Sequence, residues 1–213
     1  MPPQIMKADP MNAQGYRTQR AELPEDLWQP LYDRVNYPAA GATTLSFFSA
    51  PKGSSATLIT AGVAAARTKS QRDTNLENQN VVPTKMFKFV GISLAFIHLA
   101  ANTSTNAADR DSIRNNGYLS FRIVDKDILF LPLVAIPELN PIVSTSTTVT
   151  ATTINSIAGG GGNNVPMYKF PIPITLNPYE NFSVNLIFDG GTTTLSGTMD
   201  IGLLLQGFMR RPT

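Results

Sequence analysis

Hydrophobic and polar residues alternate along several stretches of this chain, and a period of two is the pattern of strands with one buried face. The alternation is clearest in residues 117–124 and 181–188, where every second side chain is apolar. Each of these stretches therefore predicts a strand that faces a core. Turn-forming residues delimit further expected strands at residues 43–49, 56–60, 85–100, 128–136, 144–154, 166–176 and 195–208.

Residues 85–100 depart from this alternation because both faces of the expected strand are apolar. Phe87 and Phe89 fall on one face, whereas Ile92 and Leu94 fall on the other. This composition is typical of a strand that is buried on both sides or that lies at an interface between proteins.

Proline and glycine restrict two of the other strands. Residues 166–176 contain several prolines, which cannot donate a ladder hydrogen bond, so this stretch is expected as an edge strand or an extended crossing. The last expected strand contains Gly197, Gly202 and Gly207, and glycines inside a strand indicate β-bulges or a close approach of two backbones.

The segments between the strands are interpreted mainly as turns and loops. Residues 125–127 turn the chain between two expected strands and predict a hairpin. Residues 71–80 and 103–111 are polar without periodicity and predict loops, whereas the alanine-rich residues 62–69 could form a short helix or a loop crossing. The glycine run at residues 159–162 is interpreted as a spacer.

Together these elements indicate an all-β protein with about eight strands and no alternation of strands and helices. We expect a single antiparallel β-sandwich over residues 37–213, and an eight-stranded jelly roll is the favoured form. The pattern does not determine the strand order, so other sandwich topologies remain open.

Residues 1–36 differ from the rest because they are rich in proline and lack apolar periodicity. They are interpreted as an extended N-terminal arm that reaches a neighbouring subunit, with a disordered tail as the alternative. The candidate anchoring residues of this arm are Leu27, Trp28, Leu31 and Tyr32.

The composition provides few groups for catalysis. The chain has one histidine, no cysteine and only 15% charged residues, which excludes disulfides, cysteine-ligated zinc and thiol chemistry. His98 lies inside an apolar stretch, and no G-x-S-x-G motif is present. Asp109, Asp111, Asp125 and Asp127 could offer oxygen ligands to a metal but do not follow the EF-hand pattern. We therefore expect no enzyme activity, no metal, no cofactor and no small-molecule substrate.

The formal net charge of +2 is too small to indicate a nucleic-acid footprint by itself. The candidate basic inner surface consists of Arg67, Lys69, Arg72, Arg210 and Arg211. Such a surface could face packaged nucleic acid, an internal membrane or acidic residues of a neighbouring subunit, and an ordinary solvated surface is the alternative. No secretory signal and no apolar run long enough to span a bilayer is visible, so synthesis in the host cytoplasm is expected.

Three segments carry a resemblance to a known group of proteins. Residues 37–48 read YPAAGATTLSFF, residues 177–186 read NPYENFSVNL, and residues 207–212 read GFMRRP after a strand punctuated by glycine. In these segments the chain resembles small virion proteins of bacterial viruses. The resemblance implies a shell component with a β-barrel fold, located in the virion, with no enzymatic residues to transfer.

The favoured hypothesis is therefore a self-assembling capsid subunit whose partners are copies of itself and other virion proteins. A decoration, spike or attachment protein that binds a host glycan or receptor is the alternative. A hydrolase that uses His98 or the aspartates is the least favoured of the three readings.

Overall fold

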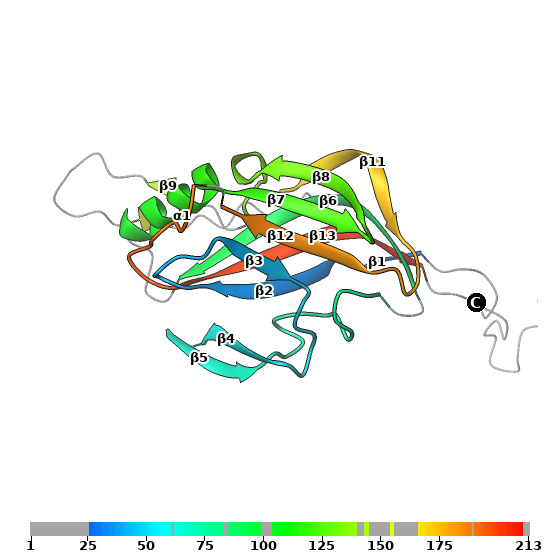
Figure 1. The fold of residues 1–213 in the computed structure, drawn as a ribbon, viewed down its shortest axis with the longest axis horizontal. Helices are drawn as coiled ribbons and strands as arrows, with labels where there is room; N and C mark the ends of the chain where they lie inside the picture. The colour runs from blue at the N-terminus through cyan, green and yellow to red at the C-terminus, as the bar shows by residue number, and fades with distance from the viewer. Residues whose placement is uncertain are drawn as a thin grey trace, which may run out of the picture.

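The computed structural model describes residues 26–60, 62–82, 85–98, 104–139, 143–144, 154–155, 166–188 and 190–210. Within this part of the chain, two antiparallel β-sheets lie face to face with the hydrophobic core between them (Figure 1). The expected all-β class and the antiparallel sandwich are therefore confirmed.

The first sheet is built around the long closing strand β13. Its strands are β1 (Asp26–Trp28), β2 (Leu31–Tyr37), β6 (Met86–His98), β11 (Tyr168–Leu176) and β13 (Met199–Arg210). Strands β1 and β2 pair with successive parts of the same edge of β13, and β6 and β11 follow on its other side.

The second sheet has the order β3-β12-β7-β8. Its strands are β3 (Thr44–Phe47), β12 (Phe182–Ile187), β7 (Tyr118–Ile123) and β8 (Lys126–Pro132). The expected hairpin around residues 125–127 is confirmed, because β7 and β8 pair directly. The strict alternation of buried and partly buried positions in β12 also matches the sequence pattern.

Eight strands of the two sheets pair in a nested order, with β1 set aside because it shares one edge of β13 with β2. Taken along the chain, the layers contain β2, β3, β6, β7, β8, β11, β12 and β13, in which β2 pairs with β13, β3 with β12, β6 with β11, and β7 with β8. The first of these strands therefore pairs with the last, the second with the second to last, and so on inward. This is the strand order that the sequence pattern left open.

Two connections differ from the expectations. Residues 62–69 were expected as a helix or loop, but strand β5 (Val63–Thr68) pairs with β4 (Ser55–Thr60) in a separate hairpin. Residues 103–111 were expected as a loop, but helix α1 (Ser104–Asn116) carries the chain from β6 to β7. Alanine has the highest helix propensity, but propensity is a weak preference that the pairing of β5 with the adjacent strand β4 overrides, which explains the first error. The helix buries little apolar surface beyond Ile113, so it lacks an apolar stripe that would reveal it.

Short elements complete the described part of the chain. A 3-10 turn covers Leu133–Ala135, and β9 (Val143–Ser144) pairs with β10 (Ile154–Asn155). Most of the strand expected at residues 144–154 and the glycine run at 159–162 lie outside the described residues.

Five large apolar residues of β6 face one core because the strand contains a bulge. In the pairing with β13, Gln206 lies opposite Gly91 whereas Gly207 lies opposite Phe89, so Val90 is an additional residue in β6. A one-residue insertion reverses the inward and outward faces. Phe87 and Phe89 before the bulge, and Ile92, Leu94 and Phe96 after it, are therefore all buried in the sandwich. The large apolar side chains that the sequence pattern distributes over two faces therefore share the core-facing side of β6, and the alternative that this strand lies at an interface between proteins stays a prediction.

Gly207 occupies the position opposite this bulge. A Cβ atom there would lie against the Lys88 carbonyl oxygen and 2.5 Å from the Phe89 Cα, so only glycine fits. The expected close approach is thus found at Gly207. It is not found at Gly197, where a Cβ would meet nothing within 4 Å, and Gly202 is in ordinary contact with Ala95.

Candidate functional site

The hairpin of β4 and β5 lies over the outer face of the first sheet and is attached there by a buried ion pair. Arg34 on β2 and Asp200 on β13 meet with Nη2 and Oδ2 2.6 Å apart. The same Asp200 oxygen accepts a hydrogen bond of 2.7 Å from the Ile59 backbone N–H of β4, and Arg34 Nη2 donates to the Ile59 carbonyl. One side-chain pair therefore connects two strands of the sheet with the hairpin.

A second buried pair fixes the loop that follows β5. Lys69 Nζ lies 2.6 Å from Asp33 Oδ1, and the other oxygen of Asp33 accepts a 2.7 Å hydrogen bond from the Phe48 backbone N–H. Burial raises the pKa of Asp33 above its ordinary value, and Lys69 opposes this shift by favouring the carboxylate. The pair joins the first sheet to the chain that leaves β3.

A third pair lies beside the first. Arg67 donates two hydrogen bonds to Asp73, of 2.7 and 2.5 Å, in the bidentate geometry that suits a carboxylate. Burial acts to raise the pKa of Asp73, but the hydrogen bonds from Arg67 and Ser70 outweigh it and hold the pKa well below its usual value. Arg34 Nη1 lies 3.9 Å from Asp73, which brings the first and third pairs together.

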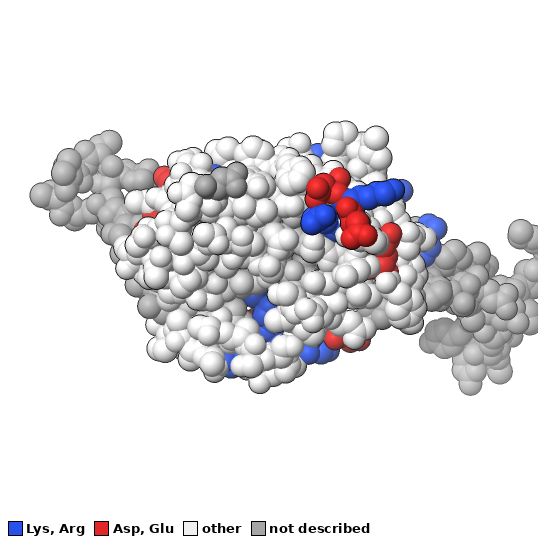
Figure 2. Space-filling view, in the orientation of Figure 1, with Lys and Arg blue, Asp and Glu red and all other residues white. Residues whose placement is uncertain are grey.

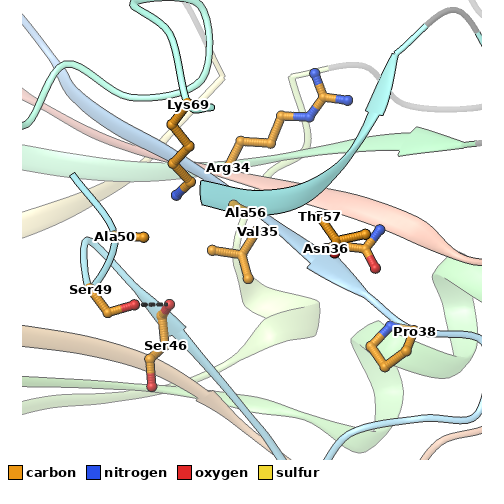
Figure 3. A pocket seen from close by; sticks show the side chains of 10 residues that line it. All are labelled: Arg34, Val35, Asn36, Pro38, Ser46, Ser49, Ala50, Ala56, Thr57 and Lys69. Atoms are coloured by element: carbon orange, nitrogen blue, oxygen red, sulfur yellow. Dashed lines mark hydrogen bonds between the residues drawn. The ribbon is translucent and has the colours of Figure 1, made fainter. Parts of the chain in front are cut away.

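A pocket of about 410 Å³ opens between the hairpin, β2 and the end of β3 (Figure 3). Its polar lining includes Asn36, Ser46, Ser49 and Thr57, and the Ser49 hydroxyl donates to the Ser46 carbonyl oxygen over 3.1 Å. The guanidinium group of Arg34 points away from the two serines, so the aliphatic part of its side chain lines the space. The pocket presents hydroxyl and amide groups rather than an unpaired charge.

The charges around this pocket balance. Arg34, Arg67 and Lys69 are each bonded to one of the carboxylates Asp33, Asp73 and Asp200. A bound anion would have to displace one of these carboxylates, which is unfavourable for buried pairs. We therefore interpret these three ion pairs as structural contacts that attach the hairpin to the sandwich. Within the described residues, no group of three or more His, Cys, Asp or Glu side chains is arranged to hold a metal ion.

The candidate basic surface is dispersed in the structure. Lys69 is buried, and Arg67 is bonded to Asp73, so neither presents a free cation to a partner. Arg72 is exposed in the loop after β5. Arg210 is exposed at the far end of β13 from Asp200, and Arg211 lies outside the described residues. The four members of the sequence cluster that the structure describes therefore do not form one continuous basic patch.

The candidate anchors of the arm belong to the sandwich itself. Leu27 and Trp28 lie in β1, and Leu31 and Tyr32 lie in β2, both of which pair with β13. Leu31 is buried in the core, whereas 53% of the Trp28 surface is exposed. The expected boundary between arm and body after residue 36 falls inside β2, so the described part of the arm is a pair of strands. Residues 1–25 lie outside the described residues.

The candidate chemical residues are distributed over separate elements. His98 lies in β6 opposite Met199, and its side chain is not among those described. Asp109 on α1 accepts hydrogen bonds from Ser196 and so attaches the helix to the chain before β13. Asp127 pairs with Arg122 across the β7–β8 hairpin at 2.8 Å.

Sequence reasoning missed a second set of buried charges, beside α1. Glu138 Oε2 lies 3.3 Å from Arg110 Nη1, and Glu138 Oε1 lies 3.0 Å from Arg114 Nη1. The Arg110 guanidinium also lies over the Phe96 ring, 5.5 Å from the ring centroid. Burial raises the pKa of Glu138 and lowers the pKa of Arg110. The two arginines, which lie four residues apart and so on one face of the helix, could have indicated a shared anionic partner.

A groove of about 440 Å³ lies on the outer face of the first sheet, at the end where β1 and the last residues of β13 meet. Trp28 packs edge to face against Phe208 with ring centroids 4.9 Å apart. The groove combines apolar side chains with two cations and is lined by Met86, Lys88, Val90, Pro173, Thr175, Phe208 and Arg210.

The outer face of the second sheet is the other conspicuous surface. Figure 2 shows this face as mostly uncharged, with the charged residues gathered near the β7–β8 turn. Ile128, Phe130 and Val134 expose apolar side chains at its β8 edge, and 57% of the Phe130 surface is accessible. Depletion of charge together with exposed aromatic residues is typical of the core of a protein interface.

No known family model and no curated protein matches the chain. Within the part of the chain that the structure describes, no helix combines the length and apolar composition needed to cross a bilayer.

Proposed function

We propose that the protein is a self-assembling virion shell subunit with a jelly-roll fold, and the resemblance noted above supports a bacterial virus as its source. The nested pairing of eight strands carries the proposal. In a jelly roll, a long folded ribbon of paired strands wraps into two four-stranded sheets. The pairs β2·β13, β3·β12, β6·β11 and β7·β8, and their distribution over two layers, agree with that arrangement.

The surfaces support a protein that associates with copies of itself. The fold alone does not determine function, since jelly rolls also occur in lectin domains and cupins. Two separate surfaces, however, expose apolar side chains: the β8 edge and the groove beside Phe208. The β8 edge has little charge, and the charged residues that line the groove are cations. A shell subunit needs more than one such face, because each copy must contact several neighbours.

An attachment or decoration protein is the second candidate, and Tyr179 is the observation that favours it. This side chain is 68% exposed on the turn between β11 and β12, and its backbone has a φ of 62°. An exposed aromatic residue on a turn is a group on which a sugar ring can stack, as expected for a protein that binds a host glycan.

The native mass of the full-length protein, by light scattering with negative-stain imaging of the same sample, distinguishes the two candidates. A shell subunit forms particles or sheets in the megadalton range. A monomer or small oligomer that binds a glycan array, with binding lost in Tyr179→Ala, would overturn the shell proposal and support attachment. Tyr118→Ala, an aromatic substitution in β7 away from that turn, is the matched control.

A further inference from the structure

Lys69 is a buried cation with a single hydrogen-bond acceptor. Only 2% of its side-chain surface reaches solvent, and none of the Asp33 side chain does. An ammonium group has three N–H donors. Within the part of the chain that the structure describes, however, Lys69 Nζ donates only to Asp33 Oδ1, over 2.6 Å. The other two donors lack an acceptor, which is unfavourable for a charge that is withdrawn from water.

The backbone holds both partners in contact. Asp33 lies in β2 opposite Leu203 of β13. The Lys69 backbone N–H donates to the Ser54 carbonyl oxygen over 2.8 Å, and the Lys69 carbonyl oxygen accepts from the Gly53 N–H over 2.9 Å. The amine and the carboxyl group therefore meet in every folded molecule. Proximity of this kind corresponds to effective concentrations of about 10⁵–10⁸ M in well-oriented intramolecular reactions.

The second oxygen of Asp33 is bound by a strained residue. Phe48 has a φ of 61°, a region that is unfavourable for a bulky side chain. In this conformation its backbone N–H donates to Asp33 Oδ2 over 2.7 Å. A backbone N–H at this position stabilises the negative charge that develops when a nucleophile adds to a carboxyl carbon. Backbone strain of this kind is often found where a protein performs chemistry.

We propose that Lys69 and Asp33 condense to an intramolecular amide, an isopeptide bond between β2 and the loop that follows β5. The ammonium group first transfers a proton to Asp33 Oδ1, which gives a neutral amine beside a neutral carboxylic acid. Lys69 Nζ then attacks Asp33 Cγ, and the negative charge develops on Oδ2 beside the Phe48 N–H. The Cγ–Oδ1 bond breaks, and the hydroxyl group leaves as water with a second proton from Nζ. No other reactant is needed.

Burial favours the amide over the ion pair. The reaction removes two charges from the interior and leaves one amide N–H in place of three ammonium donors. Burial also raises the pKa of Asp33, which favours the neutral acid that the first step requires. The low exposure of both side chains excludes the water that would reverse the reaction by hydrolysis. The product joins two residues that lie 36 positions apart in the chain.

The other ion pairs around the hairpin lack this combination of chemistry and burial. Two of them contain arginine, whose guanidinium group stays protonated and is therefore not a nucleophile. Lys52 pairs with Glu77, but these side chains are 41% and 71% exposed, so water solvates both charges. Lys52 therefore provides an internal control, since it has the same amine beside a carboxylate without the burial.

The mass of the full-length protein, measured after denaturation, tests the bond. Once the folded protein has been incubated at neutral pH, the chain should be lighter than its sequence mass by one water molecule. Trypsin should release residues 21–34 joined to residues 68–72, because it does not cleave after an acylated lysine. Fragmentation of this product should place the bond between Asp33 and Lys69. The same digest should show normal cleavage after Lys52.

Lys69→Arg is the matched variant, because it keeps the positive charge but lacks a nucleophilic amine. Its mass should equal its sequence mass, whereas Lys52→Arg should lose one water as the natural protein does. A natural protein of full mass, a water loss that maps to another residue, or a loss that persists in Lys69→Arg would each overturn the bond. The reaction takes place within one chain, so these outcomes are independent of whether the protein assembles into a shell.

Discussion

Arg34 and Asp200 form an ion pair of 2.6 Å that is almost completely withdrawn from water, although both residues lie on the outer face of a sheet. Their strands are neighbours, and the hairpin of β4 and β5 covers them. The pair is satisfied on all sides, because Asn36 and the Ile59 N–H also donate to Asp200. Loss of one partner would leave the other charge buried and uncompensated.

Removal of the Asp200 carboxylate should therefore be strongly destabilising. Asp200→Ala is expected to lower the free energy of unfolding by about 3–5 kcal/mol, whereas Arg34→Met combined with Asp200→Leu should cost clearly less than the two single changes together. Urea unfolding of the natural protein, Asp200→Ala, the single variants Arg34→Met and Asp200→Leu, and the double variant measures both. Asp127→Ala breaks a half-exposed pair with Arg122 and should cost at most about 1 kcal/mol. Equal costs for Asp200→Ala and Asp127→Ala would contradict the role of the buried pair.

The aromatic core should respond according to burial. Phe121 is 1% exposed and packs against Phe89 and Phe182, with ring centroids 5.1 and 6.2 Å away. Phe121→Ala should cost about 3–5 kcal/mol of unfolding free energy. Phe130→Ala, a change of the same chemistry on the exposed edge, should cost less than about 1 kcal/mol. The ratio of the two costs, from chemical denaturation, tests the assignment of faces in the second sheet.

The strands could be predicted from sequence where their pattern depended on local alternation. β7, β12 and the β7–β8 hairpin follow directly from residues 117–136 and 181–188. The prolines of β11 also indicated correctly that this strand lies at an edge, since among the strands that the structure describes it pairs only with β6. These features depend on the residues of one segment.

The remaining features depend on residues far apart in the sequence. The bulge at Val90 is visible only through the register of β6 against β13, and it alone explains why five large side chains of β6 share one core. Asp200 occupies an outward position of an alternating strand, and from the sequence alone such a position predicts exposure to solvent. The β4–β5 hairpin, which covers this position in the fold, buries it instead. A lone acidic residue in such an apolar strand was nevertheless a signal for a buried partner.

The hydrogen bonds that Asp73 accepts predict how the stability of the protein depends on pH. Its pKa in the folded protein lies below the ordinary value of 3.8, so the folded state binds this proton less tightly than the unfolded state. The stabilisation is therefore present above about pH 4 and is lost as the pH falls below it. Asp73→Asn should be less stable than the natural protein at pH 7, and the difference should shrink between about pH 4 and pH 2. Urea midpoints that fall in parallel for both proteins would contradict this prediction.

The β7–β8 turn contains a strained residue. Val124 has a φ of 53°, a region that is unfavourable for a β-branched side chain, and it is 61% exposed. Val124→Asn should stabilise the protein by about 1 kcal/mol, because asparagine tolerates this conformation and no buried contact is lost. The melting temperature should rise by about 2–4 °C. Val134→Asn, at an exposed valine that is not at positive φ, should bring no such increase.

The exposed edge of β8 should matter for assembly and not for folding. Phe130 packs against Tyr118 at a centroid distance of 6.1 Å, and with Ile128 and Val134 it forms an apolar group beside a sheet face that carries few charges. Burial of such a group against a second subunit would contribute about 25 cal/mol for each Å² of apolar surface removed from water. Phe130→Ser should therefore reduce the fraction of protein in particles, measured by light scattering, while the urea midpoint stays nearly constant. Val63→Ser removes an equally exposed apolar group on the β4–β5 hairpin and serves as the comparison. If both variants lose particles equally, the β8 edge has no special part in the contact; if only Phe130→Ser does, this edge is a contact surface between subunits.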